Sequence, residues 1–235
     1  MRPGALSPIA VGAVLAVLAV AAVGVAFYLG SVGPAAHSAE LAADARVVLI
    51  VVAPDAQGVT LPVCIAVYPA LASGPASESV DPGQRATVSG TSAHTLAGAY
   101  PFGGGKAVAE AYGATHSVAT PHWIAIDARL LGRLPPGGPV TVSLQHPVDV
   151  FDGAQLYSFP AGIASVPAEQ LGLLMAGVSR WPVAERAQVR RELEIESLRR
   201  VTSTGAGSES MRTDLPEGQL TAWRERMRTE IVSAK

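Results

Sequence analysis

The residues that most constrain this chain lie near its N-terminus, where 21 consecutive residues from Ile9 to Leu29 carry no charge. As an α-helix, a run of this length spans roughly 32 Å, about the thickness of the hydrocarbon core of a bilayer. Phe27 and Tyr28 stand at its end, where aromatic rings favour the membrane interface. The run therefore predicts a transmembrane anchor over residues 9–29.

The distribution of positive charge around this run predicts its orientation. Arg2 and the amino terminus precede it, and no basic residue follows until Arg46. Positively charged flanks stay on the cytoplasmic side of a membrane. We therefore expect a cytoplasmic N-terminus at residues 1–8, a small polar linker at residues 30–45 and an extracytoplasmic domain at residues 46–235. On this interpretation the chain is a single-pass protein of the cell membrane.

Two other interpretations of the apolar run stay open at this point. A cleaved signal peptide is one, because the small residues Ala35, Ala36 and Ala39 could form a cleavage site. A buried helix of a soluble domain is the other. Export agrees with the cysteine content, since Cys64 is the sole cysteine and cannot form a disulfide within the chain. We expect Cys64 to be a small buried residue on a strand.

Strand and helix patterns interleave after the linker, which predicts an α/β layered domain. The first two strands flank turn residues and can form a hairpin, and residues 70–93 form a long surface loop. Strands are expected at 47–53, 61–67, 123–127 and 140–144, and helices at 105–112, 128–134, 166–176, 184–201 and 219–232.

Composition and motif spacing exclude several functions. A net charge of −2 argues against a nucleic-acid partner bound through overall charge. The run Gly103–Lys106 fails as a phosphate-binding P-loop, because Tyr100 and Ala107 stand where the motif needs Gly and Ser or Thr. No histidine pair has the spacing of a zinc protease. We interpret Asp149 and Asp152 as turn residues rather than metal ligands.

Several segments follow one another in the order and spacing of a known family. They are Val47–Pro69, Ala99–Gly104 (AYPFGG), Trp123–Asp127 (WIAID), Gly137–Val142 (GGPVTV), Phe159–Gly162 with 166–175, Ser179–Arg180, Arg190–Leu193 with Ser197–Leu198, and Arg212–Leu215 (RTDL). In this arrangement the chain resembles a degenerate member of the LytR–CpsA–Psr family of cell-envelope proteins, also called the cell envelope-related transcriptional attenuator family.

The resemblance implies a fold and a function. The expected fold is an α/β/α layered domain with a mixed central sheet, held outside the membrane by one N-terminal helix. Such a domain binds a polyprenyl (pyro)phosphate lipid in an apolar tunnel. The implied activity transfers a glycopolymer such as teichoic acid, capsule or arabinogalactan from that lipid to peptidoglycan, with assistance from Mg²⁺. The expected partners are thus the lipid bilayer, the lipid-linked glycopolymer and peptidoglycan.

The chain departs from the family pattern at positions that matter for catalysis. Arg46 stands where the family has an aspartate, Tyr68–Ala70 replaces Pro-Arg-Asp, and Val178 replaces the first arginine of an Arg-x-Arg pair. Arg180 and Arg190 remain in matching places, and guanidinium groups are suited to bind phosphate. We therefore expect Arg180 and Arg190 to bind phosphate.

Mg²⁺ needs carboxylate ligands, so we assign no metal ligand, no catalytic residue and no certain cofactor. The favoured hypothesis is an envelope protein that binds a polyprenyl (pyro)phosphate with reduced or absent catalysis. One alternative is an active transferase of the same type, which would need Mg²⁺ and other acids such as Asp44 or Asp55. Another alternative is a non-enzymatic interaction module of the envelope without a lipid ligand.

Overall fold

The computed structural model describes residues 44–55, 57–71, 77–119, 121–131, 133–135, 137–204 and 211–233. These residues belong to one unit that extends from Glu40 to Lys235. Within the described ranges, no helix is both long enough and apolar enough to cross a membrane. The predicted anchor over residues 9–29 lies outside them, as does nearly all of the predicted linker.

A five-stranded mixed sheet forms around the β-branched run near the start of the domain. That run is β1 (Arg46–Pro54), which pairs antiparallel with β2 (Thr60–Pro69) and parallel with β4 (His122–Asp127). The short strands β3 (Glu78–Val80) and β9 (Met211–Thr213) add antiparallel edges in the order β3-β2-β1-β4-β9. The mixed central sheet and the first hairpin were correctly predicted from the sequence.

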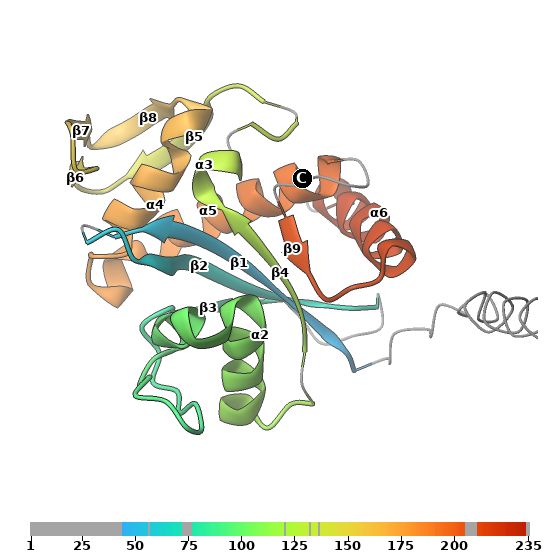
Figure 1. Cartoon of the computed structure of the whole chain (residues 1–235). Coiled ribbons are helices and arrows are strands. Elements are labelled where there is room, and N and C mark those ends of the chain that lie inside the picture. Colours follow the sequence, from blue (N-terminus) through green and yellow to red (C-terminus); the bar gives the residue numbers. More distant parts are fainter. Residues whose placement is uncertain are drawn as a thin grey trace, which may run out of the picture. The chain divides into compact units, whose positions relative to one another are not determined.

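Helices cover both faces of this sheet because the side chains of β1 are buried on both faces. Val48, Ile50 and Val52 pack against α2 (Leu96–His116), whereas Val47, Leu49 and Val51 belong to the core on the other face. That second face is covered by α3 (Ala128–Leu131), α4 (Leu171–Val178) and α5 (Val183–Ser203), and α6 (Glu217–Ser233) packs beside α5 (Figure 1).

Two small antiparallel sheets of two strands each lie beyond α4, outside the central sheet (Figure 1). One joins β5 (Val140–Leu144) to β8 (Gly162–Val166), and the other joins β6 (Val148–Phe151) to β7 (Leu156–Phe159). The sequence predicted only β5. The predicted helix over 166–176 was wrong at its start, because Val166 pairs with Val140 in a sheet. A 3₁₀ turn at Ala168–Gln170 precedes α4 instead.

Helix α2 is longer than predicted at both ends. It begins after Thr95, whose side-chain oxygen accepts a hydrogen bond from the Gly98 amide at 3.0 Å. It continues through Gly113, where the sequence predicted its end, to His116. Gly103 and Gly104 interrupt its regular geometry, and the φ of 62° at Gly104 explains why a glycine is required there. The interruption separates a short N-terminal segment from the rest of α2.

The prediction that Cys64 is a buried residue on a strand is confirmed. Cys64 lies on β2, is 1% exposed, and belongs to the core on the face of the sheet opposite α2.

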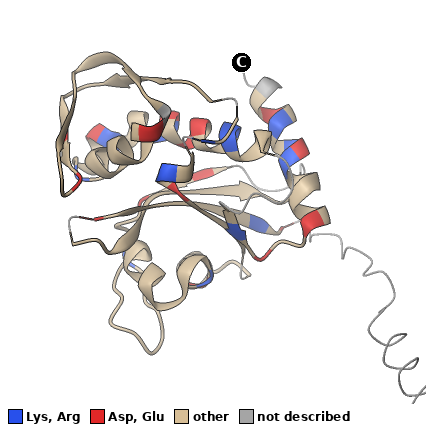
Figure 2. Cartoon of the chain, turned by 45° about the horizontal axis from the view of Figure 1, so that its top comes forward, with Lys and Arg blue, Asp and Glu red and all other residues tan. Residues whose placement is uncertain are grey.

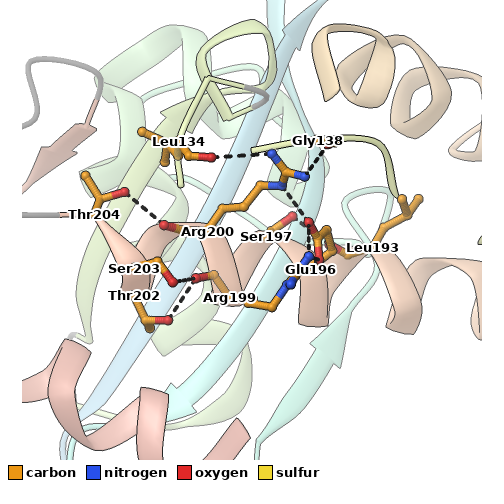
Figure 3. A network of polar contacts seen from close by, with 10 residues as sticks. All are labelled: Leu134, Gly138, Leu193, Glu196, Ser197, Arg199, Arg200, Thr202, Ser203 and Thr204. Carbon is orange, nitrogen blue, oxygen red and sulfur yellow. Dashed lines mark hydrogen bonds and ion pairs between the residues drawn. The ribbon is translucent and has the colours of Figure 1, made fainter. Parts of the chain in front are cut away.

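The charged residues of the domain concentrate on α5 and α6, while the ribbon around α2 carries few (Figure 2). Arg200 on α5 is fully buried and its Nε donates to Oε1 of Glu196 at 2.6 Å. Its other nitrogens donate to the carbonyl oxygens of Leu134 and Gly138, in the segment that leads into β5 (Figure 3). Arg199 contacts the same carboxylate from a more exposed position. Arg200 therefore ties α5 to the segment after α3.

We predict that Arg200→Ala lowers the free energy of unfolding by about 3 kcal/mol or more, because it removes the fully buried cation that pairs with Glu196, together with its hydrogen bonds to the Leu134 and Gly138 carbonyl oxygens. Arg199→Ala is the matched control. It removes a partner of the same carboxylate whose side chain is 39% exposed, and should cost about 1 kcal/mol or less. Chemical denaturation measures both changes, and equal losses would contradict a structural role specific to Arg200.

Candidate functional site

The edge of β2 opens where the strand is irregular. The pairing of β1 and β2 shifts between Val51 and Val52, so that Val63 is passed over as a β-bulge, and the neighbouring Pro62 has no amide hydrogen to donate. The next strand, β3, pairs only with Ile65–Val67. Pro62 and Val63 therefore face two adjoining cavities instead of a partner strand.

The smaller cavity, here called the arginine cavity, has a volume of about 200 Å³. Its charged lining residues are Asp81, which follows β3, and Arg186 and Arg190 from the first half of α5. Arg186 donates to Oδ2 of Asp81, and Nη2 of Arg190 lies 3.7 Å from the same oxygen. One carboxylate thus faces two guanidinium groups, which leaves a local excess of positive charge.

Arg190 carries unused hydrogen-bonding capacity at this place. Its side chain is only 10% exposed, and its buried Nη2 makes no hydrogen bond within the described part of the chain. Buried donors normally have an acceptor, so such a group points to an anionic or polar ligand. Burial alone would raise the pKa of Asp81, but the Gly83 amide, Arg186 and Arg190 together hold it below its usual value. Asp81 is therefore ionised at neutral pH.

The larger cavity, here called the apolar cavity, has a volume of about 440 Å³. Its walls come from the ends of β1 and β2, from α3 and α4, and from the β6–β7 hairpin. Most of the lining is aliphatic or aromatic, including Leu61, Val150, Phe151, Leu173 and Ala176. The two cavities share Pro62, Val63, Ala97 and Ser179 as lining residues, so they adjoin at the open edge of β2.

Glycines of α4 determine the shape of the apolar cavity. A Cβ atom at Gly172 would lie 2.4 Å from Cβ of Ala128 in α3, and one at Gly177 would lie 2.3 Å from a methyl group of Val148 in β6. Both distances are far too short for real side chains, so only glycine permits the approach. Helix α4 can therefore lie directly on α3 and on the β6–β7 hairpin, and its remaining side chains form the cavity wall.

The structure places the two predicted phosphate-binding residues at adjoining cavities. Arg190 lies in the arginine cavity, and the exposed Arg180 lies at the apolar cavity, one residue beyond the shared Ser179. The sequence interpretation missed Asp81 and Arg186. Arg186 stands one helical turn before Arg190 on a helix that was predicted, so the i,i+4 spacing was an available signal. Asp81 lay in a segment interpreted as a loop, and its contact with Arg186 spans 105 residues of sequence.

The described residues do not fit a magnesium site. No group of three or more His, Cys, Asp or Glu side chains in the described ranges could hold a metal ion. Both oxygens of Asp81 already accept hydrogen bonds, Oδ1 from the Gly83 amide and Oδ2 from Arg186. Asp55 lines the apolar cavity, but its Oδ1 accepts the amides of Gln57 and Val59 in the β1–β2 turn. Asp44 is exposed ahead of β1.

The other candidate acids and histidines have structural roles. Asp152 accepts the amides of Ala154 and Gln155 in the turn between β6 and β7, as predicted for a turn residue. Asp149 lies on β6 and accepts a hydrogen bond from Ser158 on β7, so its predicted place in a turn was wrong. His116 is half-buried in the last turn of α2, where its ring stacks on that of Tyr112 with the centroids 4.3 Å apart.

Glu194 is a buried acid that the sequence interpretation did not single out. It lies one turn after Arg190 on α5, is 5% exposed, and its Oε1 accepts a hydrogen bond from Ser79 of β3 at 2.6 Å. Burial raises the pKa of Glu194 to about 7, although Ser79 and Arg190 act in the opposite direction. The carboxyl group is therefore partly protonated near neutral pH.

Comparison with known proteins identifies the fold. No protein-family model matches the sequence, and no curated protein does. Among solved structures, a LytR-Csp2A-Psr enzyme from Actinomyces oris matches with a TM-score of 0.56 at 14% identity, over 82% of this chain and 78% of that one. TagV of B. subtilis matches with a TM-score of 0.54 at 11% identity, over 79% and 80% of the two chains.

A structure of TagT bound to LIIa-WTA matches with a TM-score of 0.50 at 12% identity, over 78% of this chain and 74% of that one. The resemblance drawn from the sequence is therefore confirmed at the level of the fold, which is that of LytR–CpsA–Psr enzymes. The α/β layers and mixed sheet expected from that resemblance are present.

The raised pKa of Glu194 predicts a dependence of stability on pH. Because its pKa is about 7 in the folded state and near 4.5 when unfolded, the folded state binds more protons between these values. The wild-type free energy of unfolding should fall by up to about 3 kcal/mol from pH 5 to pH 8, relative to Glu194→Gln, which keeps an acceptor for Ser79 without titrating. Denaturation at both pH values measures this difference. The exposed Glu110→Gln is the control and should follow the wild type; an equal pH dependence of Glu194→Gln would refute the assignment.

Proposed function

We propose that this chain is a membrane-anchored protein of the cell envelope that binds a polyprenyl (pyro)phosphate carrying a glycopolymer, with reduced or absent transferase activity. The observation that supports this most is that the apolar cavity adjoins Arg186 and Arg190 of the arginine cavity. There, Nη2 of Arg190 has no hydrogen-bond acceptor among the described residues. The predicted anchor over residues 9–29 would hold the domain on the extracytoplasmic side of the membrane. Peptidoglycan is the second partner that we propose.

The chemistry of such a lipid matches the two cavities. An isoprenoid chain that enters a cavity lined by Leu61, Phe151 and Leu173 removes its apolar surface from contact with water. Each Å² of apolar surface buried in this way favours binding by about 25 cal/mol. A phosphate at the shared wall would accept hydrogen bonds from Arg190, and Arg180 stands near enough to the same wall to add charge. TagT, which has the same fold, has been solved bound to LIIa-WTA, and this supports a glycopolymer ligand.

Two features support reduced or absent catalysis. Transfer that relies on Mg²⁺ needs carboxylate oxygens free to bind the ion, and the carboxylate nearest the arginine pair, Asp81, is engaged by Arg186. The sequence also has Arg46 and Tyr68–Ala70 where the family carries acids. Arg46 faces Glu78 at 3.9 Å, so the position contributes an ion pair between β1 and β3 instead of a metal ligand.

Binding is tested with the full chain purified in detergent and titrated with a long-chain polyprenyl phosphate, with native mass spectrometry as the readout. Arg190→Ala should weaken binding about tenfold or more, because one charge-assisted hydrogen bond is lost. Ala176→Trp should abolish binding by filling the apolar cavity. The control is Arg191→Ala, which removes an exposed arginine next to Arg190 on α5 and should leave affinity unchanged.

The same preparation separates the alternatives. Incubation with lipid-linked glycopolymer, peptidoglycan and Mg²⁺ should yield little or no transfer, and robust transfer would favour the active enzyme instead. A protein that neither retains polyprenyl phosphate from the membrane nor binds it in titration would support an interaction module without a lipid ligand.

A further inference from the structure

A third cavity lies at the carboxyl ends of the parallel strands β1 and β4. This edge cavity has a volume of about 350 Å³, and none of its lining residues is shared with the arginine cavity or the apolar cavity. The carboxyl ends of parallel strands are where open α/β sheets commonly bind ligands. The volume is within the range of small-molecule sites.

The register of the sheet brings opposite charges to this cavity. Arg212 of β9 lies directly across from Ala125 of β4, and Asp127 is two residues further along β4, so all three project from the face that α2 covers. The β9 strand is held to β4 by Thr213, whose hydroxyl donates to the carbonyl oxygen of Trp123 at 2.7 Å. Arg212 itself is exposed and lines the cavity, so its guanidinium can reach a ligand.

The carboxylate of Asp127 is held in place and kept ionised, so it acts as a hydrogen-bond acceptor. The backbone amide of Arg129 donates to its Oδ1 at 2.8 Å, and the Arg129 side chain donates to both carboxylate oxygens. Burial would raise the pKa of Asp127, but these bonds hold it below its usual value, so the group is ionised. Arg129 also balances its charge, which makes the pair nearly neutral towards a ligand.

Tyr100 supplies an aromatic wall, and the glycines of α2 put it there. A Cβ atom at Gly105 would lie 2.2 Å from the indole ring of Trp123, so the glycine lets α2 rest directly on β4. The break at Gly103 and Gly104 then redirects the short segment that carries Tyr100. Tyr100 is half-buried at the cavity; burial raises its pKa, and the charges of Arg212 and Asp127 act on it in opposite directions.

We propose that the edge cavity binds a saccharide ring. Sugar hydroxyls both donate and accept, and here they would meet an acceptor-only carboxylate in Asp127, a donor-only guanidinium in Arg212 and the hydroxyl of Thr60. The C–H face of the ring would pack on Tyr100, above an aliphatic floor that includes Val52. A free phosphate fits less well, because it has no apolar face to pack on Tyr100 and Val52. The inference rests on the proposed function in that the chain must handle a glycan, but it assigns a separate site.

The test uses the full chain in detergent with a trimer of N-acetylglucosamine as the probe, with calorimetric titration and saturation-transfer NMR as readouts. The wild type should bind the trimer, and Tyr100→Leu and Arg212→Gln should each weaken binding about tenfold. Tyr100→Phe keeps the ring and should lose only a few-fold. Arg191→Gln, the same change at an exposed position of α5, should bind as the wild type does. Thermal unfolding confirms that each variant is folded.

The outcomes separate this site from the lipid site. Loss of trimer binding in Tyr100→Leu and Arg212→Gln, with polyprenyl phosphate binding retained, supports the inference whether or not the chain is a transferase. Three results would overturn it: no trimer binding by the wild type at millimolar concentration, equal binding by Tyr100→Leu, or displacement of the trimer by equimolar inorganic phosphate.

Discussion

Burial of β1 on both faces is the constraint from which the rest of the architecture follows. Six consecutive residues, Val47–Val52, are at most 4% exposed. Each face therefore needs a helical layer, with α2 on one side and α3, α4 and α5 on the other (Figure 1). A strand covered in this way offers no surface of its own for ligands. Next to the sheet, cavities form where the strand pairing ends or becomes irregular, and the three cavities described above lie at such places.

Helix α5 shows how one element can serve both binding and stability. Its first half presents Arg186 and Arg190 to the arginine cavity, where the single carboxylate of Asp81 does not balance their charge. Its second half buries Arg200, which is fully paired with Glu196 and two carbonyl oxygens (Figure 3). The difference lies in the number of acceptors, not in burial, because both Arg190 and Arg200 are buried. Satisfied guanidinium groups stabilise a fold, whereas an unsatisfied one is available to a ligand.

The sequence predicted the parts of the fold that local patterns determine. Local signals correctly placed three elements: the continuous β-branched run of β1, the charged helix α5 and the turn between β1 and β2. The hairpin β6–β7 was missed although Val148–Phe151 alternates between buried and exposed residues, because four residues are too short to distinguish a strand from a turn. The start of α4 was misplaced because a pairing with Val140, 26 residues earlier, holds Val166 in a strand.

The candidate site was predictable only in part, for a related reason. Arg190 and Arg180 were predicted to bind phosphate from a resemblance, which was carried by positions along the sequence and contained no information on the residues that face them. Asp81 meets Arg186 and Arg190 because the short strand β3 pairs with β2 at the sheet edge, and Tyr100 lines the same cavity as Arg212 because α2 breaks at Gly103 and Gly104. Both arrangements depend on tertiary structure: one on an edge strand, the other on a glycine break whose direction no local preference determines. The run Gly103–Lys106, which fails as a phosphate-binding loop, thus has a physical role as the bend that brings an aromatic ring to the carboxyl ends of β1 and β4.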